Sequence, residues 1–381
     1  MLKRITHIIS TIELGGAEKQ LLVLTKEQIA IGMNVDVIYL KGIPTLKDEF
    51  ESLGVNVINS FANKTFIRRI AQLMIISRSK LEKFHAHLPQ AELLAMFAIP
   101  RGNFVVSRHI AAQFAPRLPR YLSRKFSQLV TSRASGVIAI SQAVADYLSR
   151  SNEVANTCKV YVVLYGAENM KSLHKTKAGS VRESLNISDN SYLVGTIARI
   201  VEQKDFPTLL NAFKYLTKVN PDSELIILGE GNLLPQMQRL AIELNIGQKV
   251  HWLGKHSDVD SYLNAMDTFI LTSKYEGFGL VLLEAIQSSV PIVASNVTSI
   301  PEVLGSNYPH LCGVGDVQAF GENLFELSKQ EFREVAVSHL MARQAIFSPL
   351  TMCQNVSNVY FEIFKDSETK PRTIKPNSKL E

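Results

Sequence analysis

The sequence predicts an α/β protein in which two doubly wound, Rossmann-like domains face each other across a cleft. The chain has 381 residues, more than one hydrophobic core usually organises. Short β-rich runs alternate with amphipathic stretches, a pattern typical of parallel sheets that helices cover on both faces. The alternation runs twice and is interrupted once, at residues 168–190, where the chain is polar and rich in lysine and serine.

Each half of the chain supplies the strands of one sheet. In the first half we expect strands at 4–10, 34–40, 55–58, 83–87, 103–109, 136–140 and 159–165. In the second half we expect strands at 192–198, 223–229, 249–254, 268–273 and 291–295. The predicted domains are therefore 1–167 and 191–348, joined by the linker 168–190. A helix at 349–365 is expected to cross back to the first domain, and 366–381 is predicted to be a disordered tail because it lacks apolar periodicity.

Charge is divided unevenly between the two halves. Residues 1–180 hold 24 lysines and arginines and 12 aspartates and glutamates, a net charge of +12, whereas residues 181–381 hold 17 and 23, a net charge of −6. The stretch 101–150 has eight cations and one acid, Asp146. A basic half points to an anionic partner such as phosphate, acidic lipid headgroups or nucleic acid.

Composition indicates a protein of a reducing compartment. The three cysteines, Cys158, Cys312 and Cys353, form no CxxC motif, so no disulfide framework is expected. The sequence contains no run of about 18 apolar residues, so no membrane-spanning helix is expected. The apolar run that follows Lys3 and Arg4 is short and interrupted, and it fits a first buried strand better than a signal peptide. We therefore expect a cytoplasmic protein.

The loop after the strand 192–198 places two cations beside the start of a helix. Arg199 and Lys204 lie in this loop, and the helix begins near Phe206 with Pro207 in its first turn. Ligands of doubly wound sheets bind beyond the carboxyl ends of the strands, so these cations are placed to bind a diphosphate. An ordinary solvated loop is the alternative.

Two acids flank the next loop-to-helix junction. Glu276 and Glu284 have seven residues between them, and helical geometry puts their carboxylates on the order of 10 Å apart. That is too far for a shared proton and suits two separate hydroxyl-bearing parts of one extended ligand. A capping acid and a surface acid are the alternative, but the apolar residues before Glu284 argue against a solvated face. The junction lets backbone amides approach a ligand closely; it consists of Gly277, Phe278, Gly279 and Leu280.

Six stretches occur in the order expected of glycosyltransferase family 4: LGGAEKQLL, ARIVEQK, ILGEGNLLPQM, VHWLGKHSDV, EGFGLVLLEA and VPIVASNVTSIPEVLG. The chain resembles this family over about residues 5–365. The resemblance implies the GT-B architecture, with an N-terminal acceptor-binding and a C-terminal donor-binding domain. It also implies a retaining enzyme without a metal, which transfers a sugar from a UDP-linked or other nucleotide-sugar donor to a glycan or lipid-linked acceptor in surface polysaccharide or glycolipid biosynthesis.

The resemblance also implies residue roles. Arg199 and Lys204 would neutralise the donor diphosphate and stabilise the charge that develops on it. Glu276 would accept hydrogen bonds from hydroxyls of the donor sugar, and Glu284 from those of the ribose. The amides of the Gly15-Gly16 turn would approach the donor phosphate or the acceptor, and Glu302 would support the same pocket.

His85 and His87 stand at a strand end. Because they alternate along the strand, we expect their rings on opposite faces of the sheet, where they cannot easily ligate one metal. A satisfied structural histidine is the commoner interpretation of such a residue. The resemblance raises His87 as a group that positions the donor sugar or the acceptor near the anomeric carbon, and His109 is a further candidate at a strand end.

The segment 115–136 combines cations with apolar residues at helical spacing, namely Leu118, Leu122, Phe126, Leu129 and Val130. The pattern resembles a basic amphipathic helix that lies on an anionic membrane through Arg117–Arg133, at the inner membrane face. The alternative, which we favour for the leucines, is that the apolar face packs on the N-terminal sheet. Nucleic acid is disfavoured as a partner because aromatic residues are not interleaved with the cations.

The pair Asp258 and Asp260 resembles the metal-binding pair of other sugar transferases. Here it directly precedes a helix, so we interpret it as helix capping and expect no metal.

Three positions depart from the family pattern. Tyr165-Gly166 replaces Asn-Gly, Ser289 replaces Gly, and Thr298-Ser299 replaces a pair of small glycines. The last change affects how closely the backbone approaches the donor, and so donor preference or activity. Two other functions stay open: a sugar-nucleotide epimerase on the same plan, for which the phosphate loop supplies no acid or base, and a non-catalytic protein that binds sugar nucleotides or glycans.

Overall fold

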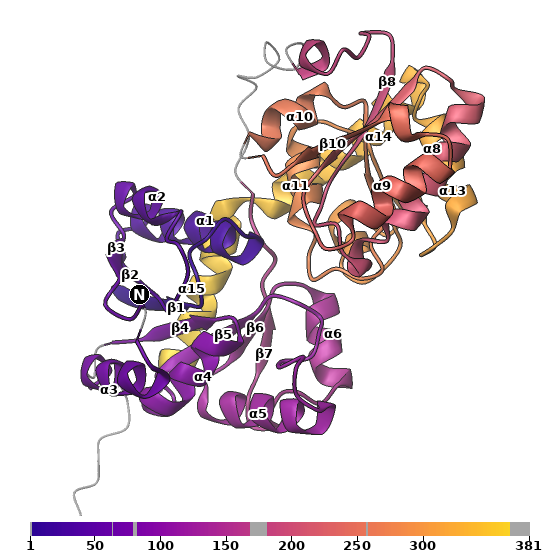
Figure 1. The fold of residues 1–381 in the computed structure, drawn as a ribbon. Helices are drawn as coiled ribbons and strands as arrows, with labels where there is room; N and C mark the ends of the chain where they lie inside the picture. The colour runs from indigo at the N-terminus through magenta and orange to yellow at the C-terminus, as the bar shows by residue number, and fades with distance from the viewer. Residues whose placement is uncertain (1, 63, 79–81, 168–180, 257, 366–381) are drawn as a thin grey trace, which may run out of the picture.

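The structure is a computed structural model that describes residues 2–62, 64–78, 82–167, 181–256 and 258–365. It contains two α/β domains, each built on one parallel sheet (Figure 1). This confirms the predicted fold class. The central strands of both sheets are buried almost throughout, which is why they read as continuous apolar runs, whereas β3 (Asn56–Ile58), β7 (Val160–Val162) and β10 (Val250–Gly254) at the sheet edges are only partly buried.

The N-terminal sheet has seven strands in the spatial order β3-β2-β1-β4-β5-β6-β7. Their bounds are β1 Arg4–Ile9, β2 Asn34–Tyr39, β3 Asn56–Ile58, β4 Phe84–His87, β5 Phe104–Arg108, β6 Val137–Ala139 and β7 Val160–Val162. The helices between them are α1 Gly16–Ala30, α2 Lys47–Ser52, α3 Phe66–Ile76, α4 Pro89–Ala98, α5 Arg120–Arg133 and α6 Gln142–Arg150. Right-handed crossovers place α1 and α2 on one face of the sheet and α3 to α6 on the other.

The C-terminal sheet has six strands in the order β10-β9-β8-β11-β12-β13. Their bounds are β8 Tyr192–Ile197, β9 Ser223–Leu228, β10 Val250–Gly254, β11 Thr268–Leu271, β12 Ile292–Ser295 and β13 Leu311–Cys312. The helices are η1 Glu202–Lys204, α8 Phe206–Val219, α9 Leu234–Glu243, η2 Gly247–Lys249, α10 Val259–Ala265, α11 Leu280–Gln287, α12 Ile300–Leu304, α13 Val317–Glu326 and α14 Gln330–Gln344. The sequence did not reveal β13, which is only two residues long.

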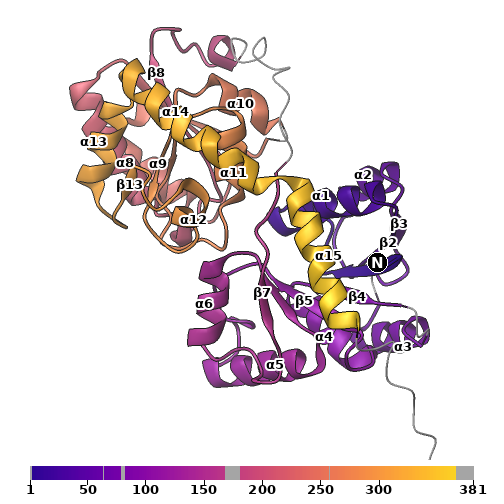
Figure 2. The same cartoon turned by 180° about the vertical axis from the view of Figure 1, so that it is seen from behind.

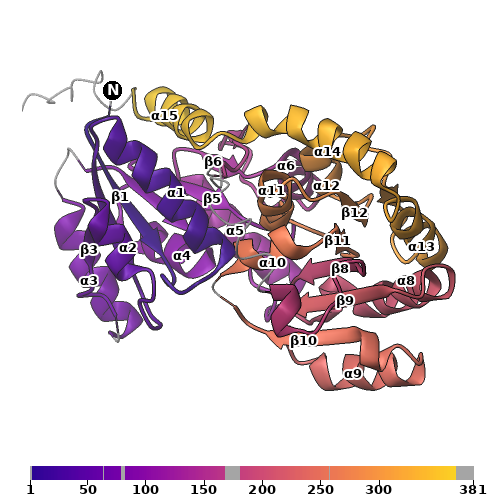
Figure 3. The same ribbon diagram turned by 90° about the horizontal axis from the view of Figure 1, so that it is seen from above.

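The chain crosses between the domains twice. After η3 Ala345–Phe347, the helix α15 Pro349–Lys365 runs back onto the N-terminal domain and packs on α1 (Figures 2 and 3). Of the linker expected from sequence, 168–180 lies outside the described residues, as does the expected tail 366–381.

Residues 181–190 differ from the expected linker because they belong to the C-terminal domain. Val181 and Ile187 are buried in its core. The Arg182 guanidinium donates to the Asp267 carboxylate at 2.8 Å, and this carboxylate also accepts from the backbone N–H of Leu193 at 2.8 Å. The polar composition of 181–190 suggested a linker, but its Arg182 is a structural group that is bonded within the C-terminal domain.

Gly166 lies where the N-terminal domain meets the start of α15. A β-carbon here would stand 2.7 Å from the Pro349 Cα and 2.9 Å from the Pro349 nitrogen. Both are backbone atoms at the start of α15, so they cannot move away as the end of a flexible side chain could. Gly166 is therefore a packing requirement of the domain crossing.

We expect Gly166→Ala to lower the free energy of unfolding by about 1–3 kcal/mol, the usual cost of overpacking. The matched control is Gly313→Ala, whose added β-carbon would meet its nearest neighbour at an ordinary 3.6 Å. Thermal unfolding followed by circular dichroism compares the two variants. Equal melting temperatures would contradict the packing role.

Candidate functional site

Lys204 and Glu276 meet at the carboxyl ends of the neighbouring strands β8 and β11. The Lys204 ammonium forms an ion pair with Oε1 of Glu276, and the Ser273 hydroxyl donates to the same oxygen at 2.6 Å. Only 13% of the Lys204 side chain and 8% of the Glu276 side chain is exposed. A buried pair of this kind depends on hydrogen bonds that fix its geometry.

Backbone contacts tie the two loops together around this pair. The Thr272 hydroxyl lies within hydrogen-bonding distance of the carbonyl oxygens of Lys204 and Asp205, at 2.9 and 3.1 Å. The Lys274 N–H donates to the carbonyl of Gln203 at 2.8 Å, and the Gln203 side chain donates in turn to the carbonyl of Tyr275. The pair is thus positioned by the protein itself.

Arg199, predicted to share the diphosphate with Lys204, is exposed at the edge of the same loop. Its guanidinium has no ion-pair or hydrogen-bond partner among the described residues, whereas Lys204 is occupied by Glu276. The binding of a diphosphate by both cations stays a prediction.

Glu284 lies on α11 and faces the N-terminal domain. Its carboxylate is 3.4 Å from the Lys19 ammonium of α1. Burial raises the pKa of Glu284, and Lys19 opposes that shift. A cavity of about 410 Å³ opens beside this pair, within the size range of ligand pockets. It is lined by Lys19, Lys26, Glu49, Asp260, Leu280 and Glu284, among others, and not by Arg199, Lys204 or Glu276.

The glycines singled out by sequence lie where the two domains touch. A β-carbon on Gly16 would meet the Leu280 side chain at 3.1 Å, and one on Gly277 would stand 2.4 Å from the His109 carbonyl oxygen. Gly15 is the N-cap of α1, and Gly279, the N-cap of α11, has a φ of 81°. Their contact with a donor stays a prediction.

Phe278, predicted to bind the donor, is buried between residues of both domains. Its ring centroid lies 5.2 Å from that of Tyr165 and 5.9 Å from that of Phe347. Only 3% of it is exposed. Phe278 therefore packs the domain junction in this structure.

Glu302 contacts the N-terminal domain, and its support of the donor pocket stays a prediction. Its carboxylate accepts from the backbone N–H groups of Gln142 and Ala143, at 2.7 and 2.6 Å, at the start of α6 in the N-terminal domain. The N-cap of that helix, Ser141, donates to the carbonyl of Gly277 at 2.8 Å. The amino end of a helix favours a carboxylate, so Glu302 serves as a contact between the domains.

The expectation for His85 and His87 was wrong. Residues two apart on a strand share a face, so the two rings lie together, with centroids 4.1 Å apart. Sequence reasoning also missed His7, which joins them from β1. Ring nitrogens of the three histidines approach within 4.8 Å of one another. Every one of these nitrogens has a hydrogen-bond partner in the protein, so hydrogen bonding accounts for the cluster.

Hydrogen bonds link the histidines in a buried chain. His7 Nε2 lies 2.9 Å from Gln28 Oε1, and His7 Nδ1 lies 3.0 Å from His87 Nε2. His87 Nδ1 lies 3.2 Å from His109 Nε2, and His109 Nδ1 contacts the Tyr165 hydroxyl. Burial lowers the pKa of His7 to about 4 and of His109 to about 3, and lowers that of His87 well below its ordinary value.

The direction of the protons in this chain follows from its ends. The amide oxygen of Gln28 accepts from His7 Nε2, and neutral rings then donate through Nε2 and accept through Nδ1 as far as Tyr165, whose hydroxyl donates to His109. Both nitrogens of His87 are therefore occupied. His87 is only 3% exposed, and the sugar contact predicted for it from the resemblance stays a prediction.

Asp258 matches its expected capping role. Its carboxylate accepts from the backbone N–H of Ser261 at 3.3 Å and from the hydroxyl of the same residue at 2.7 Å. These bonds satisfy the first turn of α10.

Helix α5 is turned the opposite way from the expected packing. Leu118, just before it, and Phe126 and Leu129 are 38–50% exposed. Its buried side is largely polar instead: it consists of the hydroxyl residues Ser123, Ser127 and Thr131, with Val130 as the one apolar member. The apolar face that we expected to pack on the sheet is thus mostly directed outward.

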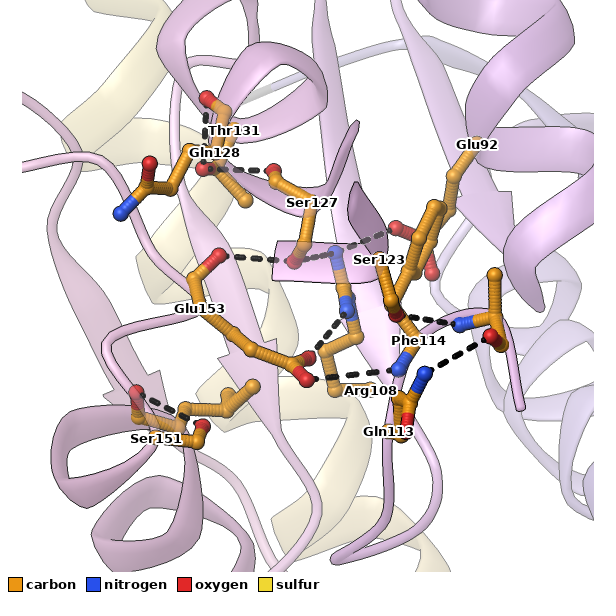
Figure 4. Close-up of polar contacts among 12 residues, drawn as sticks. Glu92, Arg108, Gln113, Phe114, Ser123, Ser127, Gln128, Thr131, Ser151 and Glu153 are labelled. Carbon is orange, nitrogen blue, oxygen red and sulfur yellow. Dashed lines mark hydrogen bonds and ion pairs between the residues drawn. The ribbon is translucent and has the colours of Figure 1, made fainter. Parts of the chain in front are cut away.

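Arg108 explains why α5 turns this way (Figure 4). Its guanidinium lies between two buried acids, 2.9 Å from Glu92 and 3.7 Å from Glu153, and donates to the Ser127 hydroxyl at 3.0 Å. The Phe114 ring covers it at 4.5 Å. Because a buried charge needs polar partners, the face of α5 above Arg108 has to be polar.

Two family models match the chain. The model described as Glycosyltransferase Family 4 matches residues 14–166, and the one described as Glycosyl transferases group 1 matches residues 179–340. Together they cover both domains. The chain belongs to glycosyltransferase family 4.

Curated relatives match less than the whole length. The chain is 26% identical over 237 residues to the N-acetyl-alpha-D-glucosaminyl L-malate synthase of Bacillus anthracis, over 61% of either chain. It is 29% identical over 241 residues to the UDP-Gal:alpha-D-GlcNAc-diphosphoundecaprenol alpha-1,3-galactosyltransferase of Escherichia coli, over 60% of this chain and 61% of that one. These matches span about three fifths of each relative.

Solved structures of the same fold match almost the entire chain. The structure of Anabaena Alr3699/HepE in complex with UDP and glucose aligns with a TM-score of 0.79 at 19% identity, over 94% of this chain and 100% of that one. WaaG, a glycosyltransferase involved in lipopolysaccharide biosynthesis, aligns with a TM-score of 0.69 at 12% identity, over 93% and 99%. At these identities the likeness establishes the GT-B fold alone.

Two of the three departures from the family 4 pattern put side chains on left-handed backbone. Ser289 has a φ of 56° and Thr298 a φ of 48°, at two positions where the resemblance leads us to expect glycine. The third departure, Tyr165, ends the histidine chain and packs on Phe278.

The Arg108 cluster makes stability depend on pH. Two buried acids share one guanidinium, and burial raises the pKa of Glu92 to about 7 and that of Glu153 above its ordinary value. Between about pH 4.5 and pH 7 the folded chain therefore binds more protons at Glu92 than the unfolded chain does. The contribution of Glu92 to stability falls as pH rises through this window.

Glutamine does not titrate, so we expect Glu92→Gln to remove this loss. Between pH 5 and pH 8 the free energy of unfolding of the variant should rise relative to that of the unmodified protein by on the order of 1–3 kcal/mol. Melting temperatures between pH 5 and pH 8 measure the effect. The exposed acid Glu331, changed to Gln, is the control and should leave the pH profile unchanged. Parallel pH profiles for Glu92→Gln and the unmodified protein would show that Glu92 is ionised throughout.

Proposed function

We propose that the protein is a retaining glycosyltransferase that moves a sugar from a nucleotide-diphosphate sugar to a glycan or lipid-linked acceptor, in surface polysaccharide or glycolipid biosynthesis. The observation that carries the proposal is the Lys204–Glu276 pair, held at the carboxyl ends of adjacent strands in a chain of family 4. This is the edge of a doubly wound sheet where ligands bind.

The donor is proposed to be UDP-linked because the similar Anabaena structures contain UDP and UDP-glucose. A lipid-linked acceptor is supported by the name of the similar E. coli enzyme, which acts on a sugar diphosphoundecaprenol.

In the proposed reaction the bond between the anomeric carbon and the diphosphate oxygen breaks, and the acceptor hydroxyl oxygen bonds to that carbon on the same face. The proton of that hydroxyl passes to the departing diphosphate oxygen. Negative charge develops on the departing diphosphate. Arg199 is exposed at the edge of the loop that also carries Lys204, and we propose that both cations stabilise that charge. Glu284 would accept from the ribose hydroxyls once Lys19 moves from its carboxylate.

Glu276 would hold the donor sugar through a single oxygen. Its Oε1 already binds Lys204 and Ser273, whereas Oε2 has no partner among the described residues. A sugar hydroxyl that donates to Oε2 would be held at a fixed distance from the cations.

A panel of UDP-glucose, UDP-galactose, UDP-N-acetylglucosamine and free UDP tests this function by thermal shift. We expect UDP and at least one UDP-sugar to raise the melting temperature. Lys204→Ala should abolish most of that shift and reduce transfer at least tenfold, because the departing diphosphate loses a cation. Lys214→Ala, on the outer helix α8, is the control.

The absence of any shift with the whole panel would contradict the proposal. Binding of a UDP-sugar without release of UDP, in the presence of lipid-linked and glycan acceptors, would favour a non-catalytic binding protein. Retention of configuration is read from the anomeric proton coupling of the product.

We also propose that the protein works in the cytoplasm, peripherally on the inner membrane face. Among the described residues, no helix is both long and apolar enough to cross a bilayer. The surface that would contact the membrane lies on α3, α4 and α5, which stand in a row on one face of the N-terminal sheet, away from the C-terminal domain (Figure 1).

This surface is apolar and basic. On α3, Ile67 is 79% exposed and Ile75 69%, and Phe97 of α4 is 51% exposed. On α5, Tyr121 is 63% exposed. The segments 64–78 and 115–134 contain several lysines and arginines and no acid. Apolar side chains would enter the boundary of the bilayer while the cations bind anionic headgroups.

Sedimentation with vesicles that contain phosphatidylglycerol tests this surface. We expect binding that falls with salt, and a loss of at least tenfold for the triple variant Arg117→Glu, Arg120→Glu, Lys125→Glu. Ile67→Ser with Ile75→Ser should also weaken binding. Ile242→Ser, equally exposed at 69% but on the C-terminal domain, is the control. Binding that ignores both salt and these changes would contradict the assignment.

A further inference from the structure

The loop after β12 holds the backbone of Glu276 from both sides. The Glu276 N–H donates to the Thr298 hydroxyl at 2.8 Å. The Ser299 hydroxyl donates to the Glu276 carbonyl oxygen at 3.3 Å. Ser299 is fully buried, so water does not compete for this bond.

Thr298 makes its bond from a conformation that costs free energy. A β-branched residue at a φ of 48° is a genuine outlier of the backbone. Glycine would adopt the same backbone without strain, but it has no hydroxyl to accept from Glu276. Strain that the surrounding structure retains points to a role at that position.

The side chain of Glu276 is fixed as firmly as its backbone. Oε1 binds Lys204 and Ser273, which leaves Oε2 as the one oxygen without a partner among the described residues. Four separate contacts therefore determine where that single acceptor lies.

The same loop continues to the domain junction. Four residues after Thr298, the Glu302 carboxylate binds the start of α6 in the N-terminal domain. The contact between the domains and the support of Glu276 thus lie on one short segment, 298–302.

We propose that Thr298 and Ser299 form a brace that positions Glu276 and thereby sets the selectivity of the enzyme for the donor-sugar hydroxyl that Oε2 accepts. This rests on the proposed function. Thr298 and Ser299 are positioning residues, because they act through Glu276. A glycine pair at these positions would leave Glu276 free to shift and to accept from neighbouring hydroxyls of the sugar.

The brace itself is tested without substrate. Hydrogen exchange measured by mass spectrometry on the peptide 273–279 should be faster in Thr298→Gly, because the Glu276 N–H loses its acceptor. Ser289→Gly is the matched control, since it also restores glycine at a left-handed position but contacts Met341 rather than Glu276. Its exchange over 273–279 should equal that of the unmodified protein.

Selectivity is tested with the UDP-sugar that the enzyme uses best in the panel and with its monodeoxy analogues. For Thr298→Gly we expect kcat/KM for the parent donor to fall about fivefold to tenfold, the range of one hydrogen bond. Discrimination against the analogue that lacks the selected hydroxyl should fall with it. The Kd for free UDP should change less than about twofold, because UDP lacks the sugar. Thr298→Ser, which keeps the hydroxyl, should restore discrimination.

Unchanged exchange at 273–279 in Thr298→Gly would overturn the brace. Faster exchange with unchanged discrimination would also overturn it, since the contact would then be structural only. If the unmodified protein neither binds nor turns over any nucleotide-sugar, the proposed function fails and the claim of selectivity fails with it, whereas the exchange data would still decide whether the brace exists.

Discussion

The buried contact between Lys204 and Glu276 is the constraint on which the rest of the C-terminal site depends. An ion pair with little exposure is stable only when its remaining hydrogen-bonding groups are satisfied, and this pair is surrounded accordingly. The Ser273 hydroxyl shares an oxygen of Glu276, and the loops after β8 and β11 bind each other through backbone groups. The parallel sheet makes this arrangement possible, because neighbouring strands end at the same edge. An arriving diphosphate would therefore meet a lysine whose position is already determined.

The same requirement, that buried polar groups find partners, shapes the N-terminal domain. Arg108 is buried between two acids, so the face of α5 above it is rich in hydroxyl side chains, and Phe126 and Leu129 of that helix are left exposed. Four polar side chains from β1, β4, the end of β5 and the end of β7 are buried beneath the junction. They form a hydrogen-bonded chain of neutral rings that runs from Gln28, the partner of His7, to Tyr165. In both places a charge or a ring buried in the sheet determines what its neighbours can be.

The sequence predicted local features such as strands and helix starts well, but it did not predict contacts between residues far apart in the chain. All twelve expected strands are present, because buried parallel strands give continuous β-branched runs. The loop positions of Lys204, Glu276 and Asp258 were also predictable from strand ends and helix starts. Nothing local indicates that Glu302 reaches α6 or that Lys19 reaches Glu284, since these contacts join residues 159 and 265 positions apart. The inward side of α5 was missed because its partner, Arg108, lies on another element. The prediction for His85 and His87 was wrong because residues two apart on a strand point to the same face. An alignment of β1 beside β4 would also have placed His7 near them.

The contacts across the domain junction have a consequence for ligand binding. Glu284 and Glu302, both acids of the C-terminal domain, bind groups of the N-terminal domain, namely the Lys19 ammonium and the start of α6. If the ribose of the proposed donor binds Glu284, its hydroxyl and the Lys19 ammonium 3.4 Å away would compete for the same carboxylate. Nucleotide binding and contact between the domains would then be linked, and the linkage would be reciprocal. Glu276 differs from these two acids, because all of its partners lie within its own domain. Its geometry therefore does not depend on the contacts with the N-terminal domain.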